Sequence, residues 1–238
     1  YTITNFYINR TVVVNYQGLF GITLGASIQN VKLLDADITG NQYIGILIGQ
    51  CKTSTVTSCE VSGNLSSGAQ FTGGLIGQMD NAGGSGTVSQ CLANVIVSGH
   101  LDVGGLIGAV TAGGCTIEKC GALGNATSTG NFVGGLVGSA DGGVIINDCY
   151  ARGDVDAGPS AFAGGLVGYT GGANNEINTC YSTGVVQGSV GTNVGIFVGV
   201  NSADISYCFY NTTTSSGSST TAEVGDNNGG TITQLTGI

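Results

Sequence analysis

Gly105-Leu106-Ile107-Gly108 is followed by Gly135-Leu136-Val137-Gly138 and then by Gly165-Leu166-Val167-Gly168, so the same four-residue pattern returns every 30 residues. Four related tetrapeptides extend the series toward both ends of the chain: Gly18-Leu19-Phe20-Gly21, Ile46-Leu47-Ile48-Gly49, Gly74-Leu75-Ile76-Gly77 and Ile196-Phe197-Val198-Gly199. The closing glycines are 28–31 residues apart. Seven matches at this spacing indicate a tandem-repeat architecture.

A second motif, an aliphatic residue followed three residues later by Cys, comes after each tetrapeptide. Its aliphatic positions are Ile28, Val56, Val88, Ile117, Ile146, Ile177 and Ile205, and the first unit has Val31 in the Cys place. A third segment reads like Gly153-Asp154-Val155. Three strand-like segments in about 30 residues, with no 3.6-residue apolar period, predict one coil of a parallel β-helix. The fold prediction is an all-β solenoid of about seven coils of 28–31 residues.

Stacked coils share a core that one coil cannot bury alone. We expect the leucine column (Leu19, Leu47, Leu75, Leu106, Leu136, Leu166, with Phe197) and the aliphatic column to point inward. Two residues separate each aliphatic residue from its Cys, where strict alternation allows one, so a corner or bulge is predicted there. The glycines beside each Leu are expected to permit tight turning or positive φ. In five units an aromatic residue stands two positions before the first glycine, and this predicts ladder or core packing. These residues are Tyr16, Tyr43, Phe71, Phe132 and Phe162, and Asp102 and Asn193 take the place in the other two units.

The pattern ends near Tyr210, which divides the chain into a solenoid over 1–210 and a tail over 211–238. The first coil is predicted to include 1–41, with opening strands in 1–15. The tail is rich in Thr, Ser and Gly, and we interpret it as a cap or a linker.

These repeats resemble the GLUG repeat, which takes its name from a Gly-Leu-hydrophobic-Gly core. The opening segment 1–10, the stretch from Asn178 to Val185 and the tail after Cys208 are also similar to parts of such arrays. The resemblance implies a β-solenoid of a large secreted or surface protein, a class that includes adhesins and the non-catalytic parts of some extracellular peptidases. Ile46 and Ile196 depart from the pattern, since each replaces a glycine.

Composition excludes several classes. Charged residues make up 8% of the chain and hydrophobic residues 41%, which argues against disorder. The net charge is −9, and the five basic residues are scattered, so nucleic acid is not an expected partner. No apolar run reaches the length of a membrane span. No cofactor is expected.

Six cysteines, Cys59, Cys91, Cys120, Cys149, Cys180 and Cys208, share one column. Their spacing does not fit a metal site, and the single His100 supplies no cluster. We interpret the column as small buried residues, with disulfides between coils as the alternative. Cys51 and Cys115 lie outside this column and are the better candidates for a bridge to something else.

Four sequons place candidate N-glycosylation at Asn9, Asn64, Asn125 and Asn211. Asn64 and Asn125 each follow the column Cys by five residues and should project outward along one edge. Modification at these positions would suit a secreted protein.

Tyr150, Tyr181 and Phe209 each follow a column Cys, and alternation predicts an outward-facing aromatic strip. Ladder stacking is the first interpretation, and contact with a glycan or another partner is the second. Acidic residues Asp141, Asp154 and Asp156, with Arg152 beside them, are interpreted as solvated surface rather than as a catalytic cluster. No catalytic residue and no metal ligand is predicted, and the chain is expected not to be an enzyme.

These features predict an extracellular structural or adhesive module at the cell surface. It would associate with itself, head-to-tail or laterally, or with other surface or matrix components, and open solenoid ends would support filament formation. A carbohydrate-binding module is the alternative, and a β-helix polysaccharide-degrading enzyme is the third hypothesis.

Overall fold

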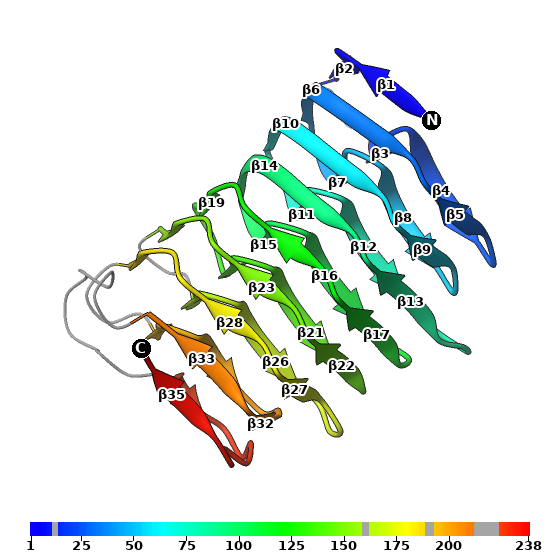
Figure 1. The fold of residues 1–238 in the computed structure, drawn as a ribbon. Coiled ribbons are helices and arrows are strands. Elements are labelled where there is room, and N and C mark those ends of the chain that lie inside the picture. The colour runs from blue at the N-terminus through cyan, green and yellow to red at the C-terminus, as the bar shows by residue number, and fades with distance from the viewer. Residues whose placement is uncertain (11–13, 159–161, 189–192, 212–223) are drawn as a thin grey trace.

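The computed structural model describes residues 1–10, 14–158, 162–188, 193–211 and 224–238. Every regular element in this part of the chain is a β-strand, and all of the strand pairings are parallel. The strands stack into a rod with the two termini at opposite ends (Figure 1). The prediction of an all-β parallel solenoid of about seven coils is confirmed.

The strands form four sheets, which we name A to D. Sheet A contains β1 (Thr2–Thr4), β2 (Tyr7–Asn9), β6 (Lys32–Gly40), β10 (Glu60–Ser67), β14 (Leu92–Gly99), β18 (Gly121–Ala122), β19 (Ala126–Ser128), β23 (Tyr150–Ala151), β24 (Val155–Ala157), β28 (Tyr181–Ser182), β29 (Val186–Gln187), β33 (Cys208–Tyr210) and β35 (Leu235–Gly237). Sheet B contains β3 (Asn15–Gln17), β7 (Gln42–Gly45), β11 (Gln70–Gly73), β15 (Leu101–Gly104), β20 (Phe132–Gly134), β25 (Phe162–Gly164) and β30 (Val194–Gly195).

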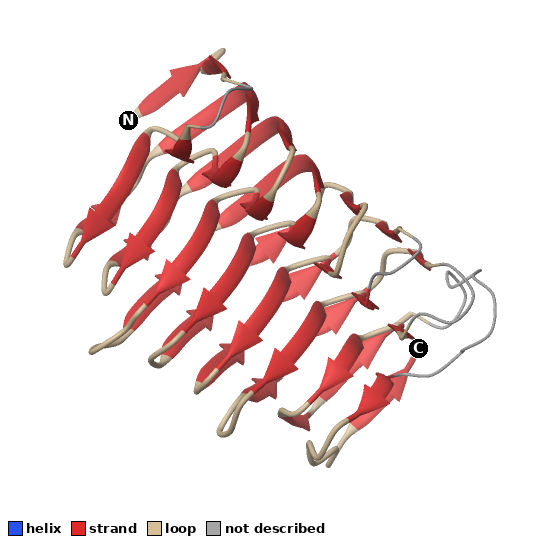
Figure 2. Cartoon of the chain, turned by 180° about the vertical axis from the view of Figure 1, so that it is seen from behind, coloured by secondary structure: helices blue, strands red, loops and turns tan. Residues whose placement is uncertain are grey.

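Sheet C contains β4 (Phe20–Leu24), β8 (Ile48–Lys52), β12 (Ile76–Asp80), β16 (Ile107–Thr111), β21 (Val137–Asp141), β26 (Val167–Gly171), β31 (Val198–Asn201) and β34 (Val224–Asn227). Sheet D contains β5 (Ser27–Gln29), β9 (Thr55–Thr57), β13 (Gly86–Ser89), β17 (Cys115–Glu118), β22 (Val144–Asn147), β27 (Glu176–Asn178) and β32 (Asp204–Ser206). The rear view in Figure 2 shows the same rungs repeated along the rod.

Each full coil passes through sheets B, C, D and A in turn, so it crosses four sheets where the sequence suggested three strand-like segments. In the coils with β18/β19, β23/β24 and β28/β29 the sheet A segment is divided into two short strands. The strand missed is that of sheet B, which is 2–4 residues long and ends in glycine in most coils. A glycine-rich segment this short carries little strand signal in the sequence.

Both ends of the chain add rungs. Strands β1 and β2 pair with β6, so residues 1–9 form a sheet A rung ahead of the first complete coil. In the tail, β34 pairs with β31 and β35 pairs with β33. The described part of the tail therefore stacks on the last coil and extends sheets C and A by one strand each. The domain boundary after Tyr210 stays a prediction.

The two apolar columns face the interior. In the leucine column Leu47, Leu75, Leu106, Leu136, Leu166 and Phe197 are fully buried, and only Leu19 in the first coil is partly exposed. The aliphatic column is in register from Ile28 to Ile205 and is buried throughout. Each such side chain contributes roughly 1.5–3 kcal/mol by leaving water, so the stack is stabilised along its length.

The tetrapeptide glycines are needed because backbones approach closely, and not because φ is positive. A Cβ on Gly105 would lie 2.1 Å from the carbonyl oxygen of Gly135 in the next coil. At the same corner the Leu136 carbonyl accepts the N–H groups of both Leu106 and Ile107, at 2.9 and 3.1 Å. A side chain at this position would push the two coils apart.

The corner predicted between sheets D and A is present. In every coil the residue before the Cys position has positive φ, between +52 and +57°: Asn30, Ser58, Gln90, Lys119, Asp148, Thr179 and Tyr207. This left-handed residue turns the chain and brings the next side chain inward. The extra residue in the aliphatic-x-x-Cys motif therefore makes the corner.

Candidate functional site

The outward aromatic strip lies on sheet A. Tyr150, Tyr181 and Phe209 are successive partners in the ladder, and Tyr181 and Phe209 are 37% and 39% exposed. The rings of Tyr150 and Tyr181 are stacked with centroids 5.3 Å apart and planes at 8°. Tyr150 also covers Gly121, since a Cβ there would lie 2.3 Å from its ring. Tyr150 is thus covered by Tyr181 on one side and by the Gly121 backbone on the other.

The second aromatic column lies on the strands of sheet B, and Tyr169 of sheet C packs against it. Tyr16, Tyr43 and Phe71 stack with centroids 4.6 and 5.0 Å apart, and Phe132 stacks on Tyr169 at 4.6 Å. Asp102 takes the aromatic place between Phe71 and Phe132. Burial raises the pKa of the Asp102 carboxyl, and a hydrogen bond with Ser139 partly opposes this. The column packs as a ladder, with Asp102 as its one interruption between coils 3 and 5.

The candidate glycosylation residues lie at the surface of sheet A or next to it. Asn9, Asn64 and Asn125 are exposed, and Asn64 and Asn125 stand in one column with Ile96 between them. The Asn125 side-chain oxygen accepts the N–H of Asp154 at 3.0 Å. Asn211 is partly buried, and its sequon threonine, like that of Asn9, lies outside the described residues.

The acidic residues do not converge. Asp154 and Asp156 are exposed on neighbouring outward positions, and Asp154 accepts the backbone N–H of Val185 at 2.9 Å. His100 contacts Thr129 at 3.0 Å, on another coil. Among the described residues, no three His, Cys, Asp or Glu side chains gather as metal ligands. Asp154, just before β24, thus links its coil to both neighbours by hydrogen bonds.

All eight cysteines are buried and unbridged. In the column the backbone N–H of Cys120 donates to the sulfur of Cys149 at 3.4 Å, and that sulfur lies 3.1 Å from the carbonyl of Asn147, to which it donates. The same pattern links each column Cys to the next. The column thiols are therefore hydrogen-bonding groups at the corner as well as small core residues. Cys51 and Cys115 are also interior, so neither lies at the surface ready to bridge to another molecule.

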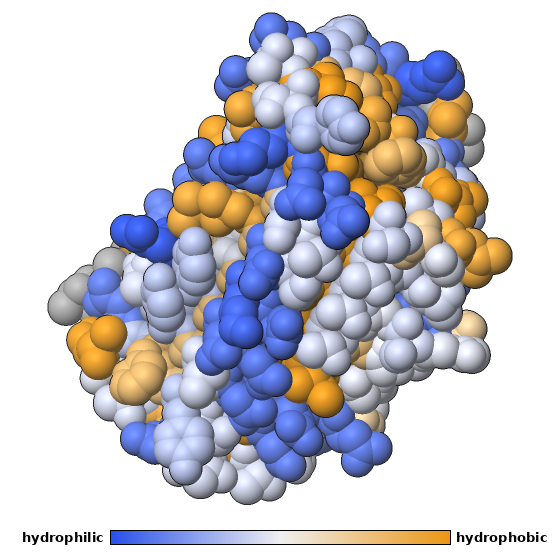
Figure 3. Space-filling model, turned by 45° about the vertical axis from the view of Figure 1, so that its right-hand side comes forward, coloured by the Kyte–Doolittle hydropathy of each residue, from blue (hydrophilic) through white to orange (hydrophobic). Residues whose placement is uncertain are grey.

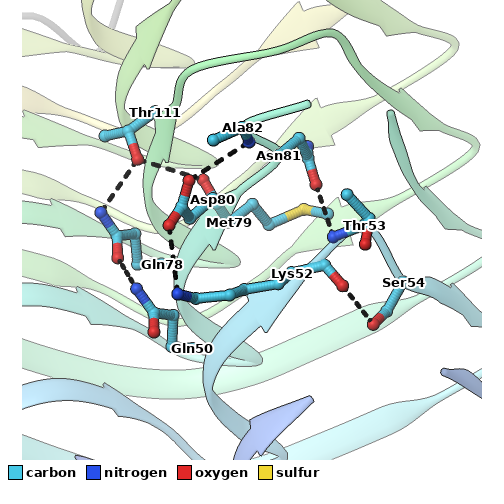
Figure 4. A network of polar contacts seen from close by, with 10 residues as sticks. All are labelled: Gln50, Lys52, Thr53, Ser54, Gln78, Met79, Asp80, Asn81, Ala82 and Thr111. Atoms are coloured by element: carbon cyan, nitrogen blue, oxygen red, sulfur yellow. Dashed lines mark hydrogen bonds and ion pairs between the residues drawn. The ribbon is translucent and has the colours of Figure 1, made fainter. Parts of the chain in front are cut away.

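A polar network that the sequence reasoning missed joins three coils through strands β8, β12 and β16 of sheet C (Figure 4). Gln50 donates to Gln78 at 2.7 Å, and Gln78 donates to Thr111 at 2.9 Å. Lys52 and Asp80 form an ion pair at 3.5 Å. The repeat alignment carries the signal, because Gln50 and Gln78 each follow a closing glycine. Paired amides along a parallel sheet fix the register of neighbouring coils.

Comparison with known proteins gives two kinds of relative. An immunoglobulin A1 protease from Streptococcus sanguinis is 29% identical over 145 residues, which is 58% of this chain and 8% of that protein. A Streptococcus pneumoniae protein of the same name is 29% identical over the same shares. Halomucin from Haloquadratum walsbyi is 31% identical over 184 residues, 71% of this chain and 2% of that protein. The sequence matches no family model.

A crystal structure supports the fold. A Bacteroides ovatus protein assigned only provisionally as an immunoglobulin A1 protease superposes with a TM-score of 0.63 and 21% identity, over 97% of this chain and 66% of that one. Identity at this level bears on the fold alone. Both comparisons agree with a β-solenoid repeat protein.

The relatives correct one expectation. The prediction that this chain is not an enzyme is wrong, because the proteins that match 58% of it are named as proteases. The prediction was based on the lack of a catalytic cluster within these residues. The repeated columns reveal how the coils pack, and they carry no information about catalysis by the larger protein. The matched segment spans 8% or less of each of these relatives. In the described part of the chain no helix has the length and apolar character to cross a membrane.

Proposed function

We propose that this chain is an extracellular repeat module of a larger surface protein, in which it forms a rigid, self-associating structural or adhesive segment. The observation that carries the proposal is the unbroken stacking of four sheets from the first coil to the last. Relatives that share the repeat only over a small part of their length support a modular role. The resemblance to GLUG repeats supports the same role and the surface location.

The first coil supplies the self-associating surface. β4 is the outermost strand of sheet C at this end, and its Phe20, Ile22 and Leu24 are 38%, 52% and 75% exposed. In the next coil Gln50 and Lys52 occupy the places of Ile22 and Leu24. Hydrophobic side chains gather toward the upper end of the face in Figure 3, where the first coils lie. An apolar edge strand is a ready template for another chain.

Analytical ultracentrifugation over a range of concentrations tests this role. We expect the wild type to associate and Leu24→Lys to remain monomeric. Ile96→Lys is the matched control, because Ile96 is 58% exposed on the side of the rod. A wild type that stays monomeric, or association lost equally in both variants, would contradict assembly through the first coil.

A second role follows from the names of the relatives. We propose that the larger protein acts on immunoglobulin A1 and that this module contacts the antibody. Surface plasmon resonance with immobilised immunoglobulin A1 measures binding, and gel electrophoresis after incubation measures cleavage. Binding or cleavage by the chain would support the role. The absence of both would refute it for this module.

The geometry does not favour the carbohydrate-binding alternative. Sugar rings stack on open aromatic faces, whereas the faces of Tyr150 and Tyr181 are directed at one another. Glycan-array binding that is lost in Tyr181→Ala would reverse this view.

A further inference from the structure

The two cysteines outside the column and the single methionine of the chain meet in the interior. Cys51 in β8 and Met79 in β12 are ladder partners on neighbouring coils. Cys115 begins β17 on the adjoining sheet D, and its sulfur lies 3.4 Å from the sulfur of Met79. All three side chains are at most 2% exposed. Three sulfur atoms from three successive coils are therefore grouped inside the turn between sheets C and D.

The local backbone is shaped around this group. Gly86 is the ladder partner of Cys115, and a Cβ on Gly86 would lie 2.7 Å from the Met79 methyl carbon. The missing side chain gives Met79 room to extend toward sheet D. Asn81, also buried, accepts the N–H of Thr53 at 3.1 Å and donates to the carbonyl of Gly114 at 3.2 Å. It holds the turns of three coils together around the sulfur atoms.

The chemistry of this group suits a soft cation. Thiolate and thioether ligands favour soft metals, among them Cu(I) and Zn(II), over ions such as Mg²⁺ and Ca²⁺. A monovalent cation that displaces one proton leaves the site neutral, so no net charge is buried. A divalent ion such as Zn(II) would have to displace both thiol protons, and it prefers four ligands where this group supplies three.

An exposed turn adjoins the site. The turn from Ala82 to Ser85 is exposed and directly follows the buried Asn81. Two consecutive glycines in this turn, and two more at 113–114, leave the backbone free of side chains that would block opening. A local opening of the turn would expose the sulfur atoms without separating the coils.

We propose that Cys51, Met79 and Cys115 form a binding site for one Cu(I) ion, a function independent of self-association. The ion would bind the two sulfur atoms of sheet C and the one of sheet D, and would cross-link the two sheets. The site breaks the repeat at all three positions, which hold Thr23, Val110 and Val144 in other coils.

Anaerobic titration of the reduced chain with Cu(I), in competition with bicinchoninate, tests the proposal. We expect one equivalent bound, at least tenfold weaker binding in Met79→Leu, and loss of the site in Cys115→Ala. Cys149→Ala is the control for the thiol column and should keep the equivalent. Circular dichroism checks that each variant is folded. If Cys115→Ala does not fold, Met79→Leu decides the outcome, because this substitution conserves side-chain volume.

Three results would overturn the proposal. These are no binding by the folded wild type, binding unchanged in Met79→Leu and Cys115→Ala, and binding lost to the same extent in Cys149→Ala. A Zn(II) titration provides a further criterion, since equal affinity for Zn(II) would contradict a site built for a monovalent ion.

Discussion

Replacing Gly105 by alanine tests whether close backbone approach sets the repeat. The added Cβ would lie 2.1 Å from the Gly135 carbonyl oxygen and 2.9 Å from the Ala122 Cβ, whereas ordinary contact begins at 3.4 Å. The coils would have to separate by about 1.3 Å at this corner. The bonds that Leu106 and Ile107 donate to Leu136 are 2.9 and 3.1 Å long and would be broken by that shift.

The magnitude follows from these contacts. Overpacking costs about 1–3 kcal/mol, and each of the two hydrogen bonds contributes about 1 kcal/mol net. Alanine lowers the entropy of the unfolded chain and returns about 0.4–1 kcal/mol. The expected loss is therefore about 3 kcal/mol. With a urea m-value of about 3 kcal/mol/M, the midpoint falls by about 1 M.

Urea unfolding followed by circular dichroism measures this effect. Gly68→Ala is the matched control, because Gly68 is exposed and its Cβ would meet nothing nearer than the Asn41 side-chain oxygen at 3.7 Å. We expect its midpoint to equal or slightly exceed that of the wild type. If Gly105→Ala unfolds at the wild-type midpoint, the close-approach explanation of the tetrapeptide is wrong.

Three more predictions concern the thiols and the surface of sheet A. The pKa of Cys91 is raised from 9.0 to about 12, first by its hydrogen bond with Cys120 and then by burial. Because the folded state keeps a proton that the unfolded state loses, stability should be constant below pH 8 and fall as pH rises from 9 toward 12, and urea midpoints across that range measure it. Tyr150→Ala should lower stability by about 1–2 kcal/mol through lost stacking, while Tyr150→Phe should change it little, as thermal unfolding will record. Lys32→Ala should cost less than about 1 kcal/mol, because its ion pair with Glu60 is solvent-exposed; a larger loss of the urea midpoint would contradict this.

The columns could be predicted because each is a sequence period. Ile117 and Cys120 are separated by two residues, one more than strict strand alternation allows, and this predicted a corner. In the structure Lys119, with positive φ, makes that corner. The fourth strand of each coil could not be predicted, since Phe132–Gly134 and its equivalents are short and end in glycine. The sequence predicted that glycine is needed beside each Leu but could not give the reason. Close backbone approach and positive φ both require glycine, so the residue alone does not distinguish them.

The interior sulfur group was missed although its signal was present. Cys51 and Met79 each stand two residues after a closing glycine, and Cys115 stands two residues before the inward Ile117. A period of two therefore places all three inside. What the sequence does not give is the distance between the columns of sheets C and D, because the turns that join them differ in length from coil to coil.

Repetition and function leave opposite traces in this chain. Positions that repeat, such as the leucine and Cys columns, are those that every coil needs for stacking. Positions that break the repeat have no such duty: Leu24 stands where Lys52 and Asp80 pair, and Met79 stands where other coils have Val110 or Ala140. A residue that departs from the repeat lowers the stability gained by stacking the coils, and the neighbouring coils must offset that loss. Those departures, rather than the columns, are where binding activity should be sought first.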